Sequence, residues 1–507
     1  MKPKSSILIA PLVLLVAVAL PIQLAAQHTR YKLIDIGALG GPVSTITEFE
    51  QWLLNNGTLT GIADTSIPDP YAPNCYDPEC LVQRAFEWHD GILTDLGALP
   101  GGSSSNSNWI NSRGWVAGAS QNGLIDPLTG FPEIRAVIWK NSGITDLGTL
   151  GGNESAATTV NNRGQATGIA ANTISDPFSI VGWGTQTRAF LWKNGVMRDL
   201  GTLGGPDAFG QTMNDRGQVA GFSYTNSTPN PATGVPPIHP FLWDNGNMFD
   251  LSLGGTFGVV DWLNNRGQAV GESTVAGDLA DHPFLWDRGK LTDLGTFGGS
   301  FGSASWINEA GAVVGVAGYP DPTGINHGFL WKNGKINDLG SLSGDRCSFA
   351  YAINSHEQIV GTSFEVEGIC FWPQPAITAW SAVLWENGSI IDLNSRVPSN
   401  SSLQLAIAFN INERGEIAGI GIPPGVPLGD LEVSSHAFLL IPCAEGTDDC
   451  GDPAGDTTAT TQRTPTPAIN SPTISPRRRL TPSGIMASWR ARLAHRYHIR
   501  GFGTPRK

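Results

Sequence analysis

Charged side chains are scarce in this sequence, since only 15% of its 507 residues are Asp, Glu, Lys or Arg. Glycine and proline are abundant instead, with 63 and 35 copies. Such a composition suits many short strands joined by turns and does not suit long helices.

The sequence also lacks the common catalytic motifs. It has no Gly-x-Ser-x-Gly nucleophile turn, no His-Glu-x-x-His pair and no phosphate-binding glycine loop. The Gly-rich segments such as Leu150-Gly151-Gly152 have no following Lys or predicted helix, so we interpret them as turns between repeats. We therefore predict no catalytic residue and no cofactor, and we favour a protein that is not an enzyme.

The N-terminus has the layout of a secretory signal peptide. Lys2 and Lys4 precede an apolar run over 7–20, and Pro21 and the small residues Ala25-Ala26 follow it. We predict a signal peptide over residues 1–26, cleaved after Ala26, and hence a secreted or cell-envelope protein. The alternative is an uncleaved membrane anchor, because residues 7–26 are nearly long enough to span a bilayer. No lipid-attachment Cys follows the run.

The six cysteines lack the spacing of a metal site, because no Cys-x-x-Cys motif or Cys/His cluster is present. They fall into three pairs that are close in sequence. An even number of cysteines in an exported chain favours disulfides, and metal binding is the alternative. The candidate disulfides are Cys75 with Cys80, Cys347 with Cys370, and Cys443 with Cys450.

A sequence pattern with a period of about 43–55 residues is repeated eight times over residues 31–441. One copy has Val160-Asn161-Asn162-Arg163-Gly164, then Gly168, Ala189-Phe190-Leu191-Trp192, Asn194-Gly195 and Asp199-Leu200-Gly201. Each copy supplies four short strands: one ends at the Asn motif, one is short and apolar, one is aromatic and one ends in Asp-Leu-Gly. Four strands joined as a meander form a propeller blade.

We therefore predict an all-β fold, an eight-bladed β-propeller of four-stranded antiparallel blades over residues 27–442. The first Asp-Leu-Gly-type strand, at Leu33 to Gly37, precedes every other segment, whereas the eighth repeat lacks this strand. The N-terminal strand is expected to complete the last blade, which closes the ring and removes two exposed edges.

Three residue types recur at fixed places in the repeat, and we expect structural roles for them. We predict that the tryptophans pack between blades rather than forming platforms for sugars. We predict that the aspartates accept N–H bonds from the following turn, with calcium ligation as the alternative. The residue before the aromatic strand alternates between His and Arg, which indicates a structural donor rather than a general base. The tryptophans are Trp88, Trp139, Trp192, Trp243, Trp286, Trp331 and Trp385; the aspartates are Asp35, Asp95, Asp146, Asp199, Asp250, Asp293, Asp338 and Asp392; the donors are His239, His282, His327, His436, Arg84, Arg135 and Arg188.

Sequence and length vary most in the loop between the second and third strands, which runs from 10 residues (272–281) to 22 (62–83). In a meander these loops all emerge on one face, where binding residues tend to be placed. We predict a ligand-binding rim there, while the alternative is that its aromatic residues only hold the loops to the blades. The candidate residues are Tyr71, Tyr76, Phe131, Phe178, Trp183, Tyr224, Tyr319, Phe371, Trp372 and Trp380.

The C-terminal part departs from the repeats. The segment 443–476 begins with the last two cysteines and continues as a Thr- and Pro-rich linker that we predict to be disordered. Residues 477–507 contain eight Arg, one Lys and no acid. Because the total charge of the chain is −13, the residues before this segment carry a net charge of −22. That balance argues against nucleic acid as a partner of the repeats. Ile485, Trp489, Leu493 and Tyr497 recur every four residues, which predicts a basic amphipathic helix that contacts an anionic envelope surface or an export partner, or else remains solvated.

The repeat resembles the HAF-repeat family of probable extracellular repeat proteins, named for a His-Ala-Phe tripeptide. His436-Ala437-Phe438 matches that tripeptide in full, and His239-Pro240-Phe241 and His282-Pro283-Phe284 are near copies. The resemblance covers nearly all of residues 31–441 and implies an exported bacterial protein. The family has no assigned activity, so the resemblance implies no catalytic residue.

These features together predict an exported, non-catalytic binding or scaffold protein, monomeric in its repeat domain, that binds an extracellular carbohydrate or protein through the rim. One alternative is a carbohydrate-active enzyme with a carboxylate pair among the loop acids. A second alternative is a structural cell-surface protein. The loop acids are Asp126, Glu133, Asp176, Asp321, Glu365 and Glu367.

Overall fold

The computed structural model describes residues 29–443 and Cys450, apart from 49, 73–74, 76–79, 232, 321–322, 367–369, 371–376 and 427–433. The predicted signal peptide (1–26), the linker over 452–476 and the basic segment 477–507 lie outside the described residues. No helix in the part that the structure describes is long and apolar enough to cross a bilayer.

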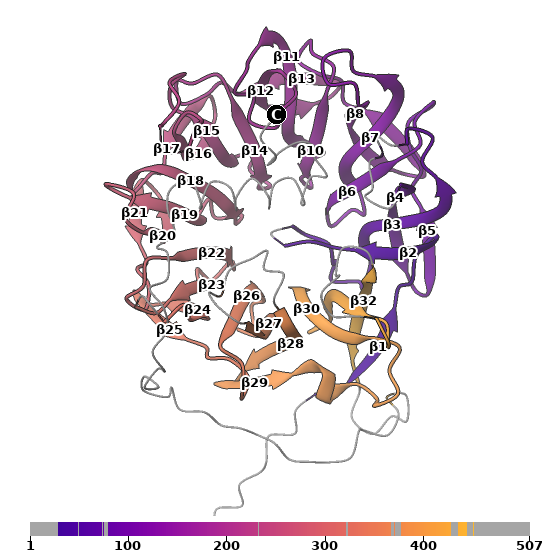
Figure 1. Cartoon of the computed structure of the whole chain (residues 1–507), viewed down its shortest axis with the longest axis vertical. Helices are drawn as coiled ribbons and strands as arrows, with labels where there is room; N and C mark the ends of the chain where they lie inside the picture. Colours follow the sequence, from indigo (N-terminus) through magenta and orange to yellow (C-terminus); the bar gives the residue numbers. More distant parts are fainter. Residues whose placement is uncertain are drawn as a thin grey trace, which may run out of the picture.

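The chain forms eight four-stranded antiparallel sheets arranged in a ring, which is an eight-bladed β-propeller as predicted (Figure 1). Each blade is a meander whose first strand lies innermost. Blades 1 to 4 comprise β2 (Gly40–Thr45), β3 (Leu59–Pro68), β4 (Leu81–His89) and β5 (Ile92–Asp95); β6 (Ser105–Ile110), β7 (Val116–Ile125), β8 (Pro132–Lys140) and β9 (Gly143–Asp146); β10 (Ser155–Val160), β11 (Ala166–Ser175), β12 (Thr185–Lys193) and β13 (Val196–Asp199); and β14 (Ala208–Met213), β15 (Val219–Tyr224), β16 (Ile238–Asp244) and β17 (Asn247–Asp250).

The remaining blades follow the same plan around the ring. Blades 5 to 8 comprise β18 (Gly254–Leu263), β19 (Ala269–Val275), β20 (Asp281–Asp287) and β21 (Lys290–Asp293); β22 (Gly302–Ile307), β23 (Val313–Gly318), β24 (Asn326–Lys332) and β25 (Lys335–Asp338); β26 (Cys347–Ile353), β27 (Ile359–Val366), β28 (Ile377–Glu386) and β29 (Ser389–Asp392), followed by the 3-10 turn η1 (Leu393–Arg396); and β30 (Gln404–Ile411), β31 (Ile417–Ile422), β32 (His436–Pro442) and β1 (Tyr31–Asp35).

The N-terminal strand closes the ring, as the repeat count predicts. Strand β1 pairs antiparallel with β32 over its full length, from Tyr31 opposite Pro442 to Asp35 opposite Phe438. The N–H of Cys443 extends this ladder by donating to the Arg30 carbonyl at 2.9 Å. Tyr31 is 1% exposed and packs in the same apolar cluster as Phe438 and Leu440, so closure buries side chains as well as backbone groups.

The inner strands of seven blades carry a β-bulge two or three residues before the turn that leads to the second strand. The bulged backbone approaches the second strand so closely that only glycine fits opposite it. At Gly221, a Cβ atom would lie 1.9 Å from the Phe209 carbonyl oxygen. This close approach explains the glycine in the second strand of the repeat.

A ring of side-chain amides joins neighbouring blades. In seven turns between first and second strands, the Asn Nδ2 donates to the backbone carbonyl at the matching turn of the next blade at 2.9–3.1 Å. Its Oδ1 accepts backbone N–H groups from two and four residues later in the same turn. The first blade has Leu54 at this position, so one link of the ring is missing. The donors are Asn111, Asn161, Asn214, Asn264, Asn308, Asn354 and Asn412.

The recurrent aspartates accept hydrogen bonds from the following turn, as predicted. In all eight copies, a carboxylate oxygen accepts the backbone N–H two residues later at 2.7–2.9 Å. The predicted packing role of the tryptophans is confirmed for Trp88, Trp139, Trp192, Trp243 and Trp385, which are buried. Burial of one such side chain contributes about 2–3 kcal/mol.

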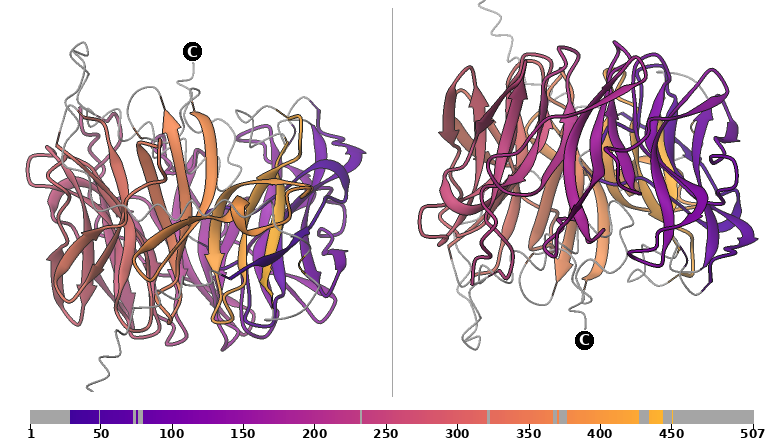
Figure 2. Two further views of the ribbon diagram at one scale, coloured as in Figure 1. Left: turned by 90° about the horizontal axis from the view of Figure 1, so that it is seen from below. Right: turned by 90° about the horizontal axis from the view of Figure 1, so that it is seen from above.

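Two faces follow from the meander, and the side views in Figure 2 show the disc between them. The turn face carries the Asn turns and the hairpins between third and fourth strands. The loop face carries the links between second and third strands and the crossings between blades.

Candidate functional site

Three adjacent blades extend farther at the loop face than the others. Strands β3, β7 and β11 of blades 1 to 3 have 10 residues each, whereas β15, β23 and β31 have 6. Each long strand stays paired with its neighbour across a register shift, as in Ile125 opposite Pro132 of β8. The three blades therefore continue into β-ribbons at one side of the loop face.

Each ribbon presents an apolar side chain to solvent at the same register. Ile67, Leu124 and Ile174 are 56%, 57% and 53% exposed, and each lies six residues after the glycine of its second strand. Their backbone N–H groups donate to a side-chain oxygen two residues earlier, on Thr65, Asn122 or Asn172, at 2.8–3.2 Å. The same local turn therefore turns an aliphatic residue outward in three consecutive blades.

Further exposed aliphatic residues lie on the same face, two in blade 2 and one in blade 5. Ile125, Leu128 and Leu279 are 48%, 59% and 77% exposed. Apolar side chains that gather on one exposed surface are typical of a binding site. Sequence reasoning missed these residues because it searched the loops for aromatic side chains, although the fixed distance from the glycine was a usable signal.

Some of the predicted rim aromatics are buried by packing among the loops. Trp183, Tyr224 and Trp380 are 7%, 1% and 3% exposed. The Tyr224 hydroxyl donates to the Phe178 carbonyl at 2.9 Å, which attaches the blade 3 loop to blade 4. These three side chains stabilise the loops, and they offer almost no surface to a ligand.

The other predicted rim residues lie nearer the surface. Tyr71, Phe131 and Phe178 are half-buried on the loop face. Tyr319 is also half-buried, and its hydroxyl donates to Asp338 at 2.5 Å. Burial and the neighbouring Asp338 carboxylate raise the pKa of Tyr319 far above its usual range. Tyr76, Phe371 and Trp372 lie outside the described residues.

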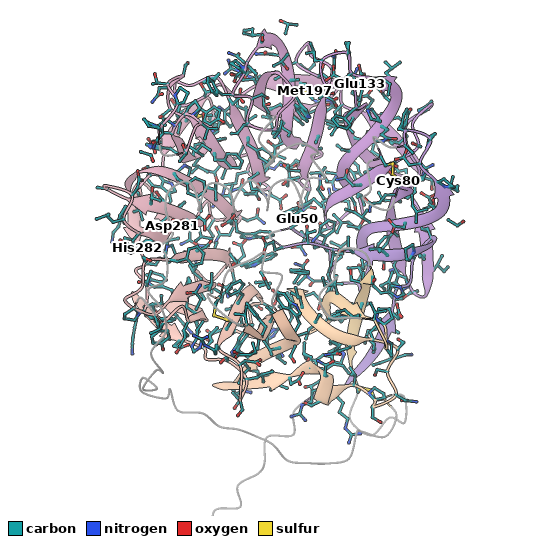
Figure 3. The ribbon with its side chains drawn as sticks, in the orientation of Figure 1. Glu50, Cys80, Glu133, Met197, Asp281 and His282 are labelled. Atoms are coloured by element: carbon teal, nitrogen blue, oxygen red, sulfur yellow. A yellow bond between two sulfur atoms is a disulfide. The ribbon has the colours of Figure 1, made fainter. Side chains whose placement is uncertain are left out.

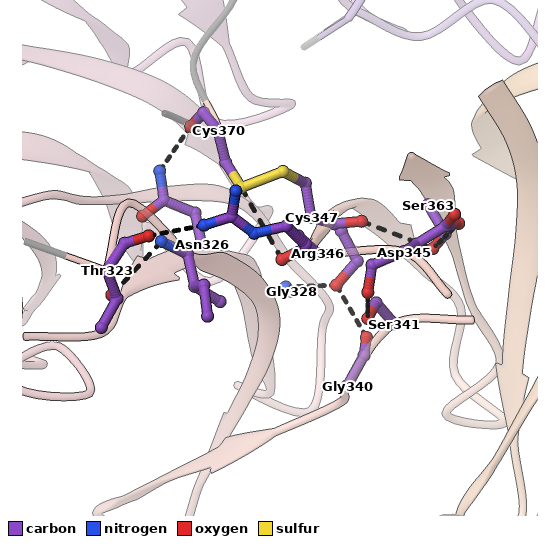
Figure 4. The surroundings of a disulfide bond; sticks show 12 residues. Thr323, Asn326, Gly328, Gly340, Ser341, Asp345, Arg346, Cys347, Ser363 and Cys370 are labelled. Atoms are coloured by element: carbon purple, nitrogen blue, oxygen red, sulfur yellow. Dashed lines mark hydrogen bonds between the residues drawn. A yellow bond between two sulfur atoms is a disulfide. The ribbon is translucent and has the colours of Figure 1, made fainter. Parts of the chain in front are cut away.

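All three predicted disulfides are formed, and two of them hold loop-face segments. Figure 4 shows the surroundings of Cys347–Cys370, which joins the start of β26 to the loop after β27. The neighbouring Arg346 donates to the Thr323 carbonyl at 2.7 Å, and Asn326 donates to the Cys370 carbonyl at 2.5 Å. The loops of blades 6 and 7 are therefore held together, and such bonds are typical of an oxidising environment.

The loop acids are used to cap loops. Asp126 is 1% exposed and accepts from the Leu128 N–H at 2.9 Å and from Asn153 Nδ2 at 2.8 Å. Asp176 likewise accepts from the Phe178 N–H at 2.9 Å. Glu133 is 6% exposed and accepts from Asn122 at 2.8 Å.

The same holds for the acids that were left out of the sequence prediction. Glu154 accepts the Ile134 N–H of the preceding blade at 2.7 Å, and burial raises its pKa to about 8. Burial, with Asp176 nearby, also raises the pKa of Asp207, which accepts the N–H groups of Ile180 and Thr187. Glu365 is half-buried on β27, and Asp321 and Glu367 lie outside the described residues.

The His residues before the aromatic strand hydrogen-bond to the recurrent aspartates, whereas the Arg residues at this position do not. His239, His282, His327 and His436 contact Asp250, Asp293, Asp338 and Asp35 at 2.7–3.0 Å. Arg84 and Arg188 lie 4.0 and 3.8 Å from Asp95 and Asp199, whereas Arg135 instead pairs with Glu133 at 3.6 Å. Within the described residues, no group of three or more His, Cys, Asp or Glu side chains is arranged to hold a metal ion.

No protein-family model and no curated protein sequence matches this chain. Solved structures with a similar arrangement are remote. Acylaminoacyl peptidase from Pyrococcus horikoshii is 10% identical with a TM-score of 0.38, over 77% of this chain and 59% of that chain. The chain thus spans less than two thirds of that peptidase. The β-propeller domain of the Trilobed protease from Pyrococcus furiosus is 11% identical with a TM-score of 0.37, over 70% of this chain and 97% of that domain. Similarity at this level shows no activity for the present chain.

Proposed function

We propose that this protein is an exported, non-catalytic binding or scaffold module of the HAF-repeat type that holds an extracellular ligand on its loop face. The observation that carries the proposal is the row formed by Ile67, Leu124 and Ile174 at one register of three adjacent blades. A protein partner fits these aliphatic side chains best, because their burial on binding would contribute about 25 cal/mol per Å² of apolar area. A carbohydrate would use the half-buried Tyr71, Phe131 and Phe178 instead.

A rigid base supports this role. The Asn ring and the Cys347–Cys370 disulfide hold the blades and loops, so little conformational entropy is lost when a ligand binds. The loop acids that would serve a glycosidase, such as Asp126, Glu133 and Asp176, are committed to capping bonds. These contacts favour binding over catalysis.

The test compares one triple and one double replacement of exposed apolar residues in the full chain. Ile67→Ser, Leu124→Ser and Ile174→Ser together alter the loop face. Ile92→Ser and Val196→Ser, at residues 68% and 66% exposed on turn-face hairpins, are the matched control. Retention of extracellular proteins from the source culture, and binding on a glycan array, are measured for each variant.

We expect the loop-face variant to lose a retained protein that the control keeps, with unchanged circular dichroism in both. Glycan binding that survives the serine changes but is lost on Tyr71→Ala and Phe131→Ala would identify a carbohydrate ligand. If both variants retain what the unaltered protein retains, and neither set changes glycan binding, the loop face is not the binding surface.

A further inference from the structure

A cationic side chain recurs on the turn face, two residues after the Asn of each turn between first and second strands. Six of the eight turns have an exposed Arg or His there; the other two have Ala310 and Asn56. Because the Asn amides bond each turn to the next, these positions lie in one ring around the propeller axis. The six residues are Arg113, Arg163, Arg216, Arg266, His356 and Arg414.

Some of these arginines lie along the ring. Arg266 Nη1 donates to the Glu309 carbonyl of the next turn at 3.0 Å, and Arg414 Nη1 donates to the Asn55 carbonyl at 3.2 Å. Arg113, Arg163 and Arg216, in the consecutive blades 2, 3 and 4, form no ion pair with any described residue. A run of unneutralised guanidinium groups is unusual in a chain with a net charge of −13.

One carboxylate from blade 4 lies beside the turn of blade 3. This carboxylate belongs to Asp215, in the turn of blade 4. It accepts the backbone N–H of Asn162 at 2.8 Å and the side-chain Nδ2–H of Asn162 at 2.9 Å. The corresponding residues in the turns of blades 2 and 3 are the neutral Ser112 and Asn162. The turns of blades 2 and 3 therefore each supply a cation and no carboxylate of their own.

An aromatic side chain stands within this cationic group. Trp115 is half-buried, at a position where blades 3, 4, 5 and 7 have glutamine. The guanidinium carbon of Arg113 lies 5.7 Å and the ammonium nitrogen of Lys140 lies 5.1 Å from its ring centroid. The indole also reaches the next turn, because a Cβ atom on Gly164 would lie 2.8 Å from it. An indole beside two cations can stack on a sugar ring while the cations pair with its acidic groups.

Indoles also fill the axis below the ring. Trp109 of β6 stacks on Trp262 of β18 with ring centroids 5.2 Å apart, and Trp262 stacks on Trp306 of β22. Strands β6 and β18 belong to blades 2 and 5, which lie on different sides of the ring in Figure 1. The stacked side chains therefore meet near the axis. Figure 3 places Glu50, in the link between β2 and β3, near the same axis. The ring of arginines therefore surrounds an axis that carries three stacked indoles, and a ligand would lie across it.

The chain also enters and leaves the propeller on this face. Arg30 and Cys443 pair beyond the ends of β1 and β32, and Pro442 lies 3.6 Å from where a Cβ of the turn residue Gly415 would be. The segment 477–507, with nine positive charges and no acid, follows in the sequence and lies outside the described residues.

We propose that the turn face, centred on Arg113, Trp115, Arg163 and Arg216, binds an anionic polysaccharide bearing closely spaced carboxylates or sulfates. This surface is separate from the loop face and does not depend on the ligand proposed there. The guanidinium groups pair with the acidic groups and Trp115 stacks on a sugar ring. A polysaccharide is favoured over nucleic acid because the three disulfides are typical of an oxidising environment outside the cytoplasm.

The test uses the full chain and two variants with equal loss of charge. The ring variant is Arg113→Gln, Arg163→Gln and Arg216→Gln. The matched control is Lys193→Gln, Lys290→Gln and Lys335→Gln, on exposed outer hairpins of the same face. Affinities for polygalacturonate and dextran sulfate are measured at about 0.15 M salt, where long-range attraction is screened, with neutral dextran as the uncharged probe. Because every variant keeps the basic segment 477–507, its contribution is the same in all of them.

We expect the ring variant to bind about tenfold or more weakly, the control to change by less than about threefold, and Trp115→Ala to weaken binding with no change in charge. Neutral dextran should not bind. Equal losses in the two Gln variants would overturn the proposal, because they would indicate unspecific attraction. Binding unchanged in the ring variant, or duplex DNA bound as tightly and lost in the same variant, would also overturn it.

Discussion

The amide ring of the turn face predicts a large effect for one small substitution, Asn264→Ala. Asn264 is 3% exposed and its side chain makes four hydrogen bonds. Oδ1 accepts from the N–H groups of Arg266 and Gln268 at 3.0 Å, and Nδ2 donates to Gln268 Oε1 at 2.8 Å and to the Asn308 carbonyl of blade 6 at 3.0 Å.

Each such bond contributes about 1 kcal/mol, and the groups left behind are largely buried, so Asn264→Ala should lower the free energy of unfolding by about 4 kcal/mol. The unfolding entropy of roughly 400 propeller residues, about 2 cal/mol/K each, converts this loss to a decrease in melting temperature of about 5 °C. Calorimetry at one scan rate and urea denaturation monitored by tryptophan fluorescence measure the two quantities.

The adjacent Asn265→Ala is the matched control. Asn265 is exposed, and its side chain hydrogen-bonds, among the residues that the structure describes, to Asp215 through one bond of 2.8 Å and a marginal one of 3.5 Å. Its loss should cost no more than about 1 kcal/mol. Equal destabilisation by the two substitutions would refute the view that the Asn amides hold the blades together.

Two further predictions concern ring closure and the inner bulge. Burial acts to raise the pKa of the Asp35 carboxyl, but the hydrogen bond from His436 outweighs burial and lowers this pKa. The same bond to Asp35 raises the pKa of His436. The pair should therefore stabilise the closed ring fully between about pH 4 and 6.5, losing its contribution as pH rises through the raised pKa of His436 or falls through the lowered pKa of Asp35. Asp35→Asn should lower stability by about 1 kcal/mol in that window and by less outside it, as measured by melting temperature against pH; a constant difference at every pH would contradict the pairing. Gly221→Ala should prevent soluble folding, because the added Cβ would lie 1.9 Å from the Phe209 carbonyl oxygen. Gly143→Ala should fold normally, because its Cβ would lie 3.6 Å from the Lys140 carbonyl oxygen. Soluble yield and circular dichroism of the two variants test this difference.

The architecture was predictable because each strand type occurs in several copies. A single strand such as Leu33 to Gly37 is weak evidence for a fold. This strand type occurs eight times, however, with its first copy before the first repeat and no copy in the eighth repeat, which implies that the two ends of the chain meet. The roles of the aspartates and of the His donors followed from the same reasoning, because a residue repeated around a ring serves the ring.

The features that were missed depend on contacts between repeats or within unrepeated loops. The partner of the Asn264 amide is the carbonyl of Asn308, 44 residues later, and a sequence period does not reveal which backbone atom lies beside it. Trp183 and Tyr224 looked like exposed loop aromatics, yet both pack in a cluster of strand and loop residues from blades 2 to 5. Ile67, Leu124 and Ile174 look like ordinary strand residues until the register shift turns them outward.

Closure of the ring by the N-terminal strand is tested most directly by hydrogen exchange of the backbone amides. The peptide covering β1 (Tyr31–Asp35) should exchange as slowly as the one covering β5 (Ile92–Asp95), the matching outer strand of blade 1, because both are paired along their length. Exchange in β1 at the rate of an unpaired chain end, with β5 still protected, would contradict the closed propeller.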